Sequence, residues 1–170
     1  NQQIDAIEID PANRKWIATS EGAWLFSEDG DSLIHHFTTE NSPLASNIVG
    51  DIEINPISGE VFFATSKGLV SYRSYATEGK PSHAQVKIFP NPVKPGYTGT
   101  IGITGLVDGA IVKITDLSGN LVREMHAVGG TATWDGNTLS GRRATPGVYL
   151  VFSASSDGEE TFIGKLAFFK

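Results

Sequence analysis

The stretch WIATSEGAWLF (residues 16–26) is nearly repeated by FFATSKGLVSY (residues 62–72), 46 residues further along the chain. Upstream, IDAIEID (residues 4–10) matches VGDIEIN (residues 49–55), but at a spacing of 45 residues, which predicts one extra turn residue in the second copy. The alternating upstream stretches predict strands with one buried face, and the quoted stretches predict hairpins that open at glycine. Each copy therefore reads as about four short strands joined by tight turns.

A four-stranded unit that repeats about every 40 to 50 residues is typical of a β-propeller blade. A single blade cannot bury both of its faces, so blades stack around an axis and share their cores. Residues 1–75 supply fewer than two blades, and the chain begins at Asn1 with neither Met nor a signal-peptide pattern. We therefore expect the last blades of a propeller, at the C-terminal end of a longer protein. The alternative is a β-sandwich in which the similarity between the two stretches is coincidental.

The second half of the chain predicts a further all-β domain. Residues 76–85 are polar and contain Gly and Pro, as expected of a linker. Residues 86–170 read as about seven short strands separated by Gly-rich turns, a pattern typical of an Ig-like β-sandwich. The prolines of VKIFPNPVKPG (residues 86–96) place its strand at a sheet edge or at the entrance of a sandwich. Hairpin turns are expected at two pairs of residues: Gly119 with Asn120, both at positive φ, and Asp157 with Gly158.

Composition and charge narrow the classes of function. The absence of cysteine excludes disulfides, thiolate metal sites and thiol nucleophiles. A net charge of −6 argues against non-specific binding of nucleic acid, and no apolar run approaches the roughly 20 residues that span a bilayer. The charge is uneven, because residues 1–80 carry 5 basic and 12 acidic side chains, whereas residues 81–170 carry 8 and 7. This difference indicates two units with different surfaces.

The sequence contains no motif for hydrolase, phosphate-loop or zinc-protease chemistry. His35 and His36 are adjacent on a predicted strand, so their side chains point to opposite faces and do not easily share an ion. SEDGD (residues 27–31) lacks the spacing of a calcium loop and is expected to be a solvated turn. We therefore expect no catalytic residue, no metal and no cofactor. Two charged groups are interpreted as solvated turns: Asp157, Glu159 and Glu160, and Arg142 with Arg143. For the two arginines, the alternative is a contact that docks an anionic partner.

The run from Phe37 to Tyr72 resembles the two-component-regulator type propeller repeat. The residues that carry this resemblance are Leu44, Asn47, Val49, Gly59, Ala64, Thr65, Gly68 and Leu69. The first copy departs from the pattern, because its turn from Asp10 to Asn13 has no Gly and Ala23 replaces the expected Leu. The resemblance implies propeller blades in residues 1–75.

Residues 86–170 resemble the C-terminal sorting domain family of the type IX secretion system of Bacteroidetes, and its relative, the Ig-like module of flagellar hook caps. The pieces that carry the resemblance are FPNPV (89–93), VKITDLSGNLV (112–122), GGTATWDGNTLSGRRATPGVYLV (129–151) and GKLAFFK (164–170). Each piece also has a purely structural reading. Trp134 can bury its ring in a sandwich core, and Tyr149 alternates with its neighbours across a strand.

Blade-like repeats followed by a sorting-domain-like sandwich resemble the PorZ family of the type IX secretion machinery. This resemblance implies a non-enzymatic component of the outer cell surface that works with the protein partners of the secretion and sortase complex. It also implies contact with anionic lipopolysaccharide through upstream domains. The sandwich would serve as a docking module, with Gly147, Tyr149, Gly164, Lys165 and Lys170 as its implied docking residues.

Two other functions fit the same sequence. In the first, the chain belongs to a secreted propeller cargo, a glycan-binding protein or an enzyme, and the sandwich is a sorting signal removed on export. In the second, it is the sensor part of a hybrid two-component regulator, which would continue beyond Lys170 into a membrane helix and a kinase.

Overall fold

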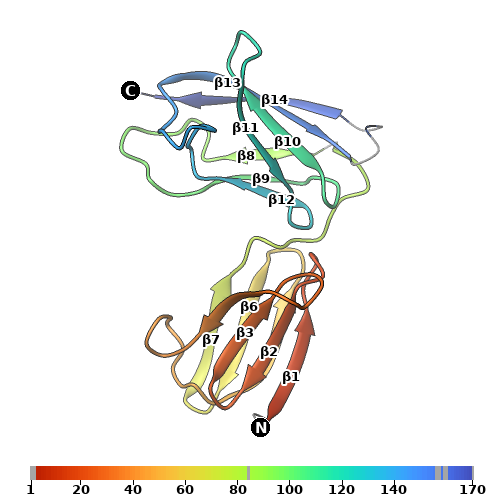
Figure 1. The fold of residues 1–170 in the computed structure, drawn as a ribbon, viewed down its shortest axis with the longest axis vertical. Helices are drawn as coiled ribbons and strands as arrows, with labels where there is room; N and C mark the ends of the chain where they lie inside the picture. Colours follow the sequence, from red (N-terminus) through yellow and green to blue (C-terminus); the bar gives the residue numbers. More distant parts are fainter. Residues whose placement is uncertain (1–2, 84, 156–157, 159–160, 170) are drawn as a thin grey trace. The chain divides into compact units, whose positions relative to one another are not determined.

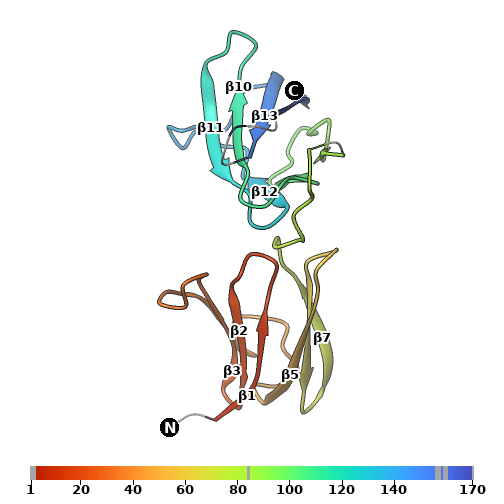
Figure 2. The same ribbon diagram turned by 90° about the vertical axis from the view of Figure 1, so that its right-hand side faces the viewer.

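The computed structural model describes residues 3–83, 85–155, 158 and 161–169, without the side chains of residues 161–163. These residues form fourteen strands in four antiparallel sheets, with no helix among them (Figures 1 and 2). The predicted all-β class is therefore confirmed. The chain divides into two compact units, residues 1–78 and 79–170, called unit 1 and unit 2 below. No membrane-spanning helix is found in the described part of the chain.

Unit 1 consists of two sheets that enclose one core. The first sheet is formed, in this order, by β1 (Ile4–Ile9), β2 (Lys15–Thr19), β3 (Gly22–Phe26) and β4 (Leu33–Phe37). The second is formed by β5 (Val49–Asn55), β6 (Glu60–Thr65) and β7 (Gly68–Arg73). Trp16 and Phe37 from the first sheet pack against Phe63 from the second, with ring centroids 5.9 and 5.8 Å from that of Phe63. The described residues form no closed ring of sheets.

The β1–β2 and β5–β6 turns account for the change of spacing within the repeat. In the first copy the Asn13 amide donates to the Asp10 carbonyl, three residues back. In the second copy the Gly59 amide donates to the Asn55 carbonyl, four residues back, so this turn contains the predicted extra residue. Asn13 has a φ of 57° and Gly59 a φ of 71°. Asn is one of the few residues other than Gly that adopt this left-handed conformation readily, which explains why the first turn works without Gly.

Unit 2 consists of a four-stranded and a three-stranded sheet around a second core. The four-stranded sheet has the order β11 (Leu121–His126), β10 (Ile111–Thr115), β13 (Gly147–Ala154) and β14 (Thr161–Phe168). The three-stranded sheet has the order β12 (Thr131–Trp134), β9 (Ile101–Thr104) and β8 (Lys87–Phe89). Strand β8, which precedes the prolines, lies at a sheet edge as predicted. Trp134 is buried between the sheets, also as predicted.

Three local predictions are corrected by the structure. The sequence predicts about four strands in each repeat copy, but the sheet of the second copy has three in the described residues, β5 to β7. The alternation in β1 predicts one buried face, but its large apolar residues Ile7 and Ile9 are each 57% exposed, and Ala6 packs against the core instead. A register shift between Ile4 and Ala6 accompanies this inversion. At the β10–β11 turn, Gly119 has the expected positive φ of 84°, whereas Asn120 is not among the residues with positive φ. At the other predicted hairpin turn, Gly158 has a φ of 75°, and Asp157 lies outside the described residues.

Candidate functional site

Four of the five implied docking residues lie on the hairpin of β13 and β14. Gly147 begins β13, is exposed, and lies opposite Phe168 in the β13–β14 ladder. Gly164 is half-buried opposite Val151, and Lys165 is exposed. Lys170 lies outside the described residues. The hairpin therefore brings Gly147, Gly164 and Lys165 onto neighbouring strands.

Tyr149 has a different environment, because its side chain belongs to the core of unit 2. It is 6% exposed, and its ring centroid lies 6.0 Å from that of Trp134 and 5.4 Å from that of Phe168. Its hydroxyl donates a 2.7 Å hydrogen bond to the Thr145 carbonyl, four residues upstream. A tyrosine that bonds back to the backbone in this way is typical of the tyrosine corner of Ig-like sandwiches. Tyr149 can therefore hold the β13 backbone in place beneath a docking surface, but its side chain offers little exposed area to a partner.

The two adjacent arginines have different environments. Arg143 donates to the backbone carbonyls of Asp135 and Tyr97 and lies over the ring of Phe168, 5.6 Å from its centroid. It therefore holds two loops and the end of β14 together, as a structural cation rather than a free one. Arg142 donates a 3.3 Å hydrogen bond to Ser140 and is exposed.

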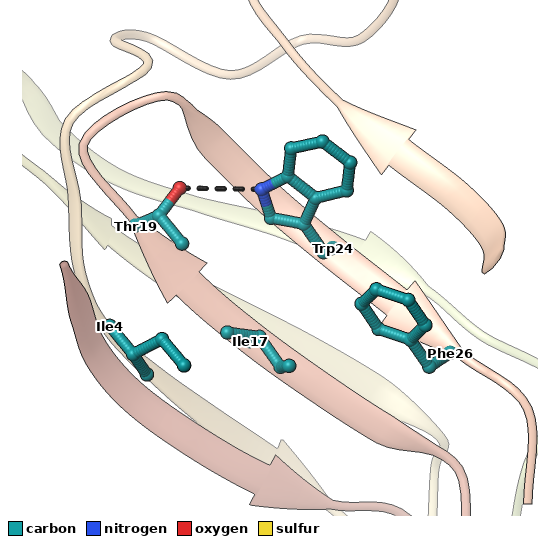
Figure 3. A pocket seen from close by; sticks show the side chains of 5 residues that line it. All are labelled: Ile4, Ile17, Thr19, Trp24 and Phe26. Atoms are coloured by element: carbon teal, nitrogen blue, oxygen red, sulfur yellow. Dashed lines mark hydrogen bonds between the residues drawn. The ribbon is translucent and has the colours of Figure 1, made fainter. Parts of the chain in front are cut away.

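In unit 1, the face of β1–β4 directed away from the core forms an apolar surface, called the outer face below. An open hollow of about 240 Å³ lies on this face. Figure 3 shows the residues that line it, which are Ile4, Ile17, Thr19, Trp24 and Phe26. The Trp24 indole donates a 3.3 Å hydrogen bond to the Thr19 hydroxyl, and its ring stacks on that of His36 at 3.5 Å between centroids. The side chains of Ile4 and Ile7 are more than half exposed beside it. Contiguous exposed apolar surface of this kind is typical of a surface that contacts another protein segment or a ligand.

The internal repeat relates the outer face to the core. The residues that line the hollow correspond, at spacings of 45 or 46, to residues on the core-facing side of β5–β7: Val49, Phe63, Thr65, Val70 and Tyr72. Conversely, the buried Ala18 and Leu25 correspond to the exposed Ala64 and Ser71. The two sheets are therefore stacked head to tail, with corresponding faces pointing in the same direction. A two-fold symmetric sandwich would instead turn corresponding faces toward each other.

The groups considered for metal binding do not converge. His36 stacks on Trp24, whereas the ring of His35 contacts that of Phe37, so the two histidines lie on opposite faces of β4 as predicted. The SEDGD loop joins β3 to β4, and hydrogen bonds from the Ser27 hydroxyl and the Asp31 amide lower the pKa of Asp29. Across the described residues, no group of three or more His, Asp or Glu side chains is placed to hold a metal ion.

Comparison with known proteins finds similarity among solved structures. No protein-family model matches the chain, and no match is found among curated proteins. Among solved structures, the chain is similar to PorZ of Porphyromonas gingivalis, an essential bacterial surface component of the type IX secretion system. The two are 32% identical, with a TM-score of 0.68, over 99% of this chain and 23% of PorZ. The chain is thus PorZ-like over nearly its whole length, and it spans less than a quarter of PorZ.

Two further structures show weaker similarity. Dimeric latent PorU from P. gingivalis is 22% identical, with a TM-score of 0.39, over 64% of this chain and 12% of PorU. The extracellular domain of the candidate hybrid two-component system BT4673 from B. thetaiotaomicron is 12% identical, with a TM-score of 0.34, over 100% of this chain and 25% of that one. TM-scores this low carry no argument about this chain.

The outer face was not identified from the sequence, although the sequence contains a signal for it. The run AWLF in β3 is apolar at four successive positions, so the strand presents apolar side chains on both faces. Such continuous runs are typical of strands that are covered on both sides. Here Ala23 and Leu25 enter the core, whereas Trp24 and Phe26 line the outer hollow.

Proposed function

We propose that this chain forms part of a non-enzymatic surface component of the type IX secretion and sortase machinery. The observation that carries the proposal is the 32% identity to PorZ at a TM-score of 0.68 over 99% of this chain. In this proposal residues 1–75 are the last blades of a propeller, residues 76–85 are a linker, and residues 86–170 are an Ig-like sandwich that docks protein partners at the cell surface.

The head-to-tail stacking in unit 1 supports the propeller part of the proposal. Propeller blades repeat around an axis, and each blade has two different faces. The first face of one blade therefore packs against the second face of the next blade. The β1–β4 and β5–β7 sheets have this relation. The outer hollow at Ile17 and Phe26 is equivalent to the surface at Phe63 and Tyr72 that receives the rings of Trp16 and Phe37. A preceding blade would place its own aromatic residues there.

Two features of unit 2 support the sandwich and its docking role. The hydrogen bond from Tyr149 to Thr145 and the buried Trp134 are typical of an Ig-like sandwich. On the β13–β14 hairpin, Gly147 lies at the surface with no atom within 4 Å of the place where a Cβ would be. Lys165 is exposed on the adjacent strand, so both residues are accessible to a partner.

Peptide mass spectrometry of the native cell-surface protein tests the proposed role. If the protein is a machine component, peptides from residues 86–170 remain attached to it, because the sandwich is a working domain. Their absence would instead identify an exported cargo whose sandwich is a cleaved address. Deletion of the gene provides an independent test, since loss of a machine component stops surface delivery of other proteins that carry sorting domains, and loss of one cargo does not.

The docking surface is tested by reversing one charge. Lys165→Glu is expected to reduce recovery of secretion-complex proteins with the native protein at least about tenfold, the effect of losing one good charged contact. Lys87→Glu is the matched control, because Lys87 is also exposed but lies on β8, in the other sheet of unit 2. Equal recovery with both variants would reject the β13–β14 hairpin as the docking surface.

A further inference from the structure

The feature that carries a further inference is the side of β14 that faces away from β13. Strand β14 is the edge strand of its four-stranded sheet, with β13 on one side. Edge strands present backbone donors and acceptors to any extended chain that approaches, and proteins commonly protect them. Here the segment Pro90–Val93 lies along the other side of β14 and is joined to it by four hydrogen bonds.

The backbone of Val93 makes two of these hydrogen bonds. Its amide donates to the Ala167 carbonyl at 2.7 Å, and its carbonyl accepts from the Phe169 amide at 3.0 Å. This pattern is a parallel β-bridge between Val93 and Phe168. The next residue in phase upstream is Asn91, and its recorded bonds to β14 come from its side chain rather than from its backbone.

The side chain of Asn91 makes the other two hydrogen bonds. Its Nδ2 donates to the Lys165 carbonyl at 2.7 Å, and its Oδ1 accepts from the Ala167 amide at 3.1 Å. A residue of a parallel strand placed opposite Leu166 would bond to the same carbonyl and the same amide through its backbone. The carboxamide of Asn91 therefore takes the place of one peptide unit, two positions along β14 from the Val93 bridge.

We propose that Asn91 is an edge guard, whose carboxamide occupies the backbone positions of β14 that an added strand would need. The occupant it excludes is the terminal strand of a second copy of this chain. That strand, TFIGKLAFF (residues 161–169), has one charged residue in nine, no proline and several aromatic and β-branched residues. Such segments pair readily with copies of themselves when an edge is open. The proposal concerns self-association and does not depend on the secretion role.

Amide hydrogen exchange tests whether the Asn91 carboxamide occupies the backbone groups of β14. Asn91→Leu removes both hydrogen bonds while keeping a side chain of similar size, so the Ala167 amide is expected to exchange about tenfold faster. The Phe169 amide, held by Val93, keeps its protection. The matched control is Asn120→Leu, which removes an exposed Asn whose carboxamide bonds Asp116 in the β10–β11 turn. If Ala167 exchanges at the wild-type rate in Asn91→Leu, the guard does not exist.

Binding of a labelled synthetic peptide with the sequence of residues 161–169 tests whether Asn91 excludes the terminal strand of a second copy. By fluorescence anisotropy, the whole chain carrying Asn91→Leu is expected to bind this peptide at least about tenfold more tightly than the wild type or Asn120→Leu. Faster exchange at Ala167 without tighter binding would overturn the proposal. If Asn91→Leu does not fold, Asn91→Asp gives the same comparison, because it frees the Lys165 carbonyl while keeping an acceptor for Ala167. Wild-type affinity in Asn91→Asp would then also overturn it.

Discussion

Asp10, in the β1–β2 turn, provides the sharpest test of how unit 1 is held together. Asp10 is 4% exposed, and its carboxylate accepts hydrogen bonds from the amides of Ala12 and Arg14, from the Arg14 guanidinium and from the Trp16 indole. Arg14 and Asp10 form an ion pair at 2.7 Å, and Arg14 also donates to the Ser74 hydroxyl. One carboxylate thus joins the turn, the core and the chain after β7.

The magnitude expected for Asp10→Ala follows from the groups left without a partner. Breaking a buried ion pair by removing one member costs about 3–5 kcal/mol of unfolding free energy. We expect about 3 kcal/mol, because the Arg14 side chain is 16% exposed and keeps its bond to Ser74. The matched control is Asn55→Ala at the corresponding position of the second copy. Asn55 accepts from two exposed amides, which water can satisfy instead, so we expect about 1 kcal/mol or less.

Urea titration of the whole chain, followed by residue-resolved NMR, measures both variants. Residues 79–170 serve as an internal reference, because neither substitution lies in unit 2. Asp10→Ala is expected to move the unfolding transition of unit 1 to lower urea and leave that of unit 2 unchanged. Equal shifts for Asp10→Ala and Asn55→Ala would refute the reasoning, because the buried network would then contribute nothing beyond an ordinary turn.

The remaining predictions concern the cores, the acidic turns and the outer face. Arg143→Ala is expected to cost about 2 kcal/mol in urea unfolding, and Arg142→Ala less than about 0.5 kcal/mol, because Arg143 alone holds two loop carbonyls and covers Phe168. Tyr149→Phe should cost about 1 kcal/mol by the same measurement, through the lost bond to Thr145. Hydrogen bonds from Asn120 lower the pKa of Asp116 below its ordinary 3.8, so the stability that the ionised carboxylate contributes is present above pH 3.8 and is lost as the pH falls through the lowered pKa. Thermal melts between pH 5 and pH 3 should therefore show a smaller decrease in melting temperature for Asp116→Asn than for the wild type. Trp24→Lys should change the unfolding of this chain by less than about 1 kcal/mol, yet prevent assembly of a native protein in which a further blade covers the outer face.

The turns show how much of the fold could be predicted from the sequence. A one-residue change in the spacing of two similar stretches predicted an extra turn residue, and the Asn55–Gly59 turn contains it. Prolines after residue 89 placed β8 at a sheet edge, because proline cannot donate to a ladder. These predictions succeed because turn chemistry is local: a residue that lacks an amide hydrogen or tolerates a positive φ acts through its own backbone.

The orientation of β1 could not be predicted, because it depends on contacts distant in sequence. Alternation shows that Ile7 and Ile9 share a face, but not which face is covered by the β5–β7 sheet. The small Ala6 faces the core of unit 1, where the large Trp16 and Phe37 fill the space. Tyr149 is a similar case among the implied docking residues. A motif match identifies its position, whereas its burial follows from the rings of Trp134 and Phe168 packed around it.

Head-to-tail stacking explains why both faces of the first sheet are apolar. The first copy presents projecting rings, Trp16 and Phe37, and the second copy receives them on a face that includes Phe63 and Tyr72. The two copies in this chain make that contact once, between the projecting face of the first and the receiving face of the second. The receiving face of the first copy, at Ile17 and Phe26, is then left over by the geometry itself. Stacking of this kind always leaves one receiving face unused unless it closes into a ring, so the hollow on β1–β4 follows from the repeat rather than from a ligand.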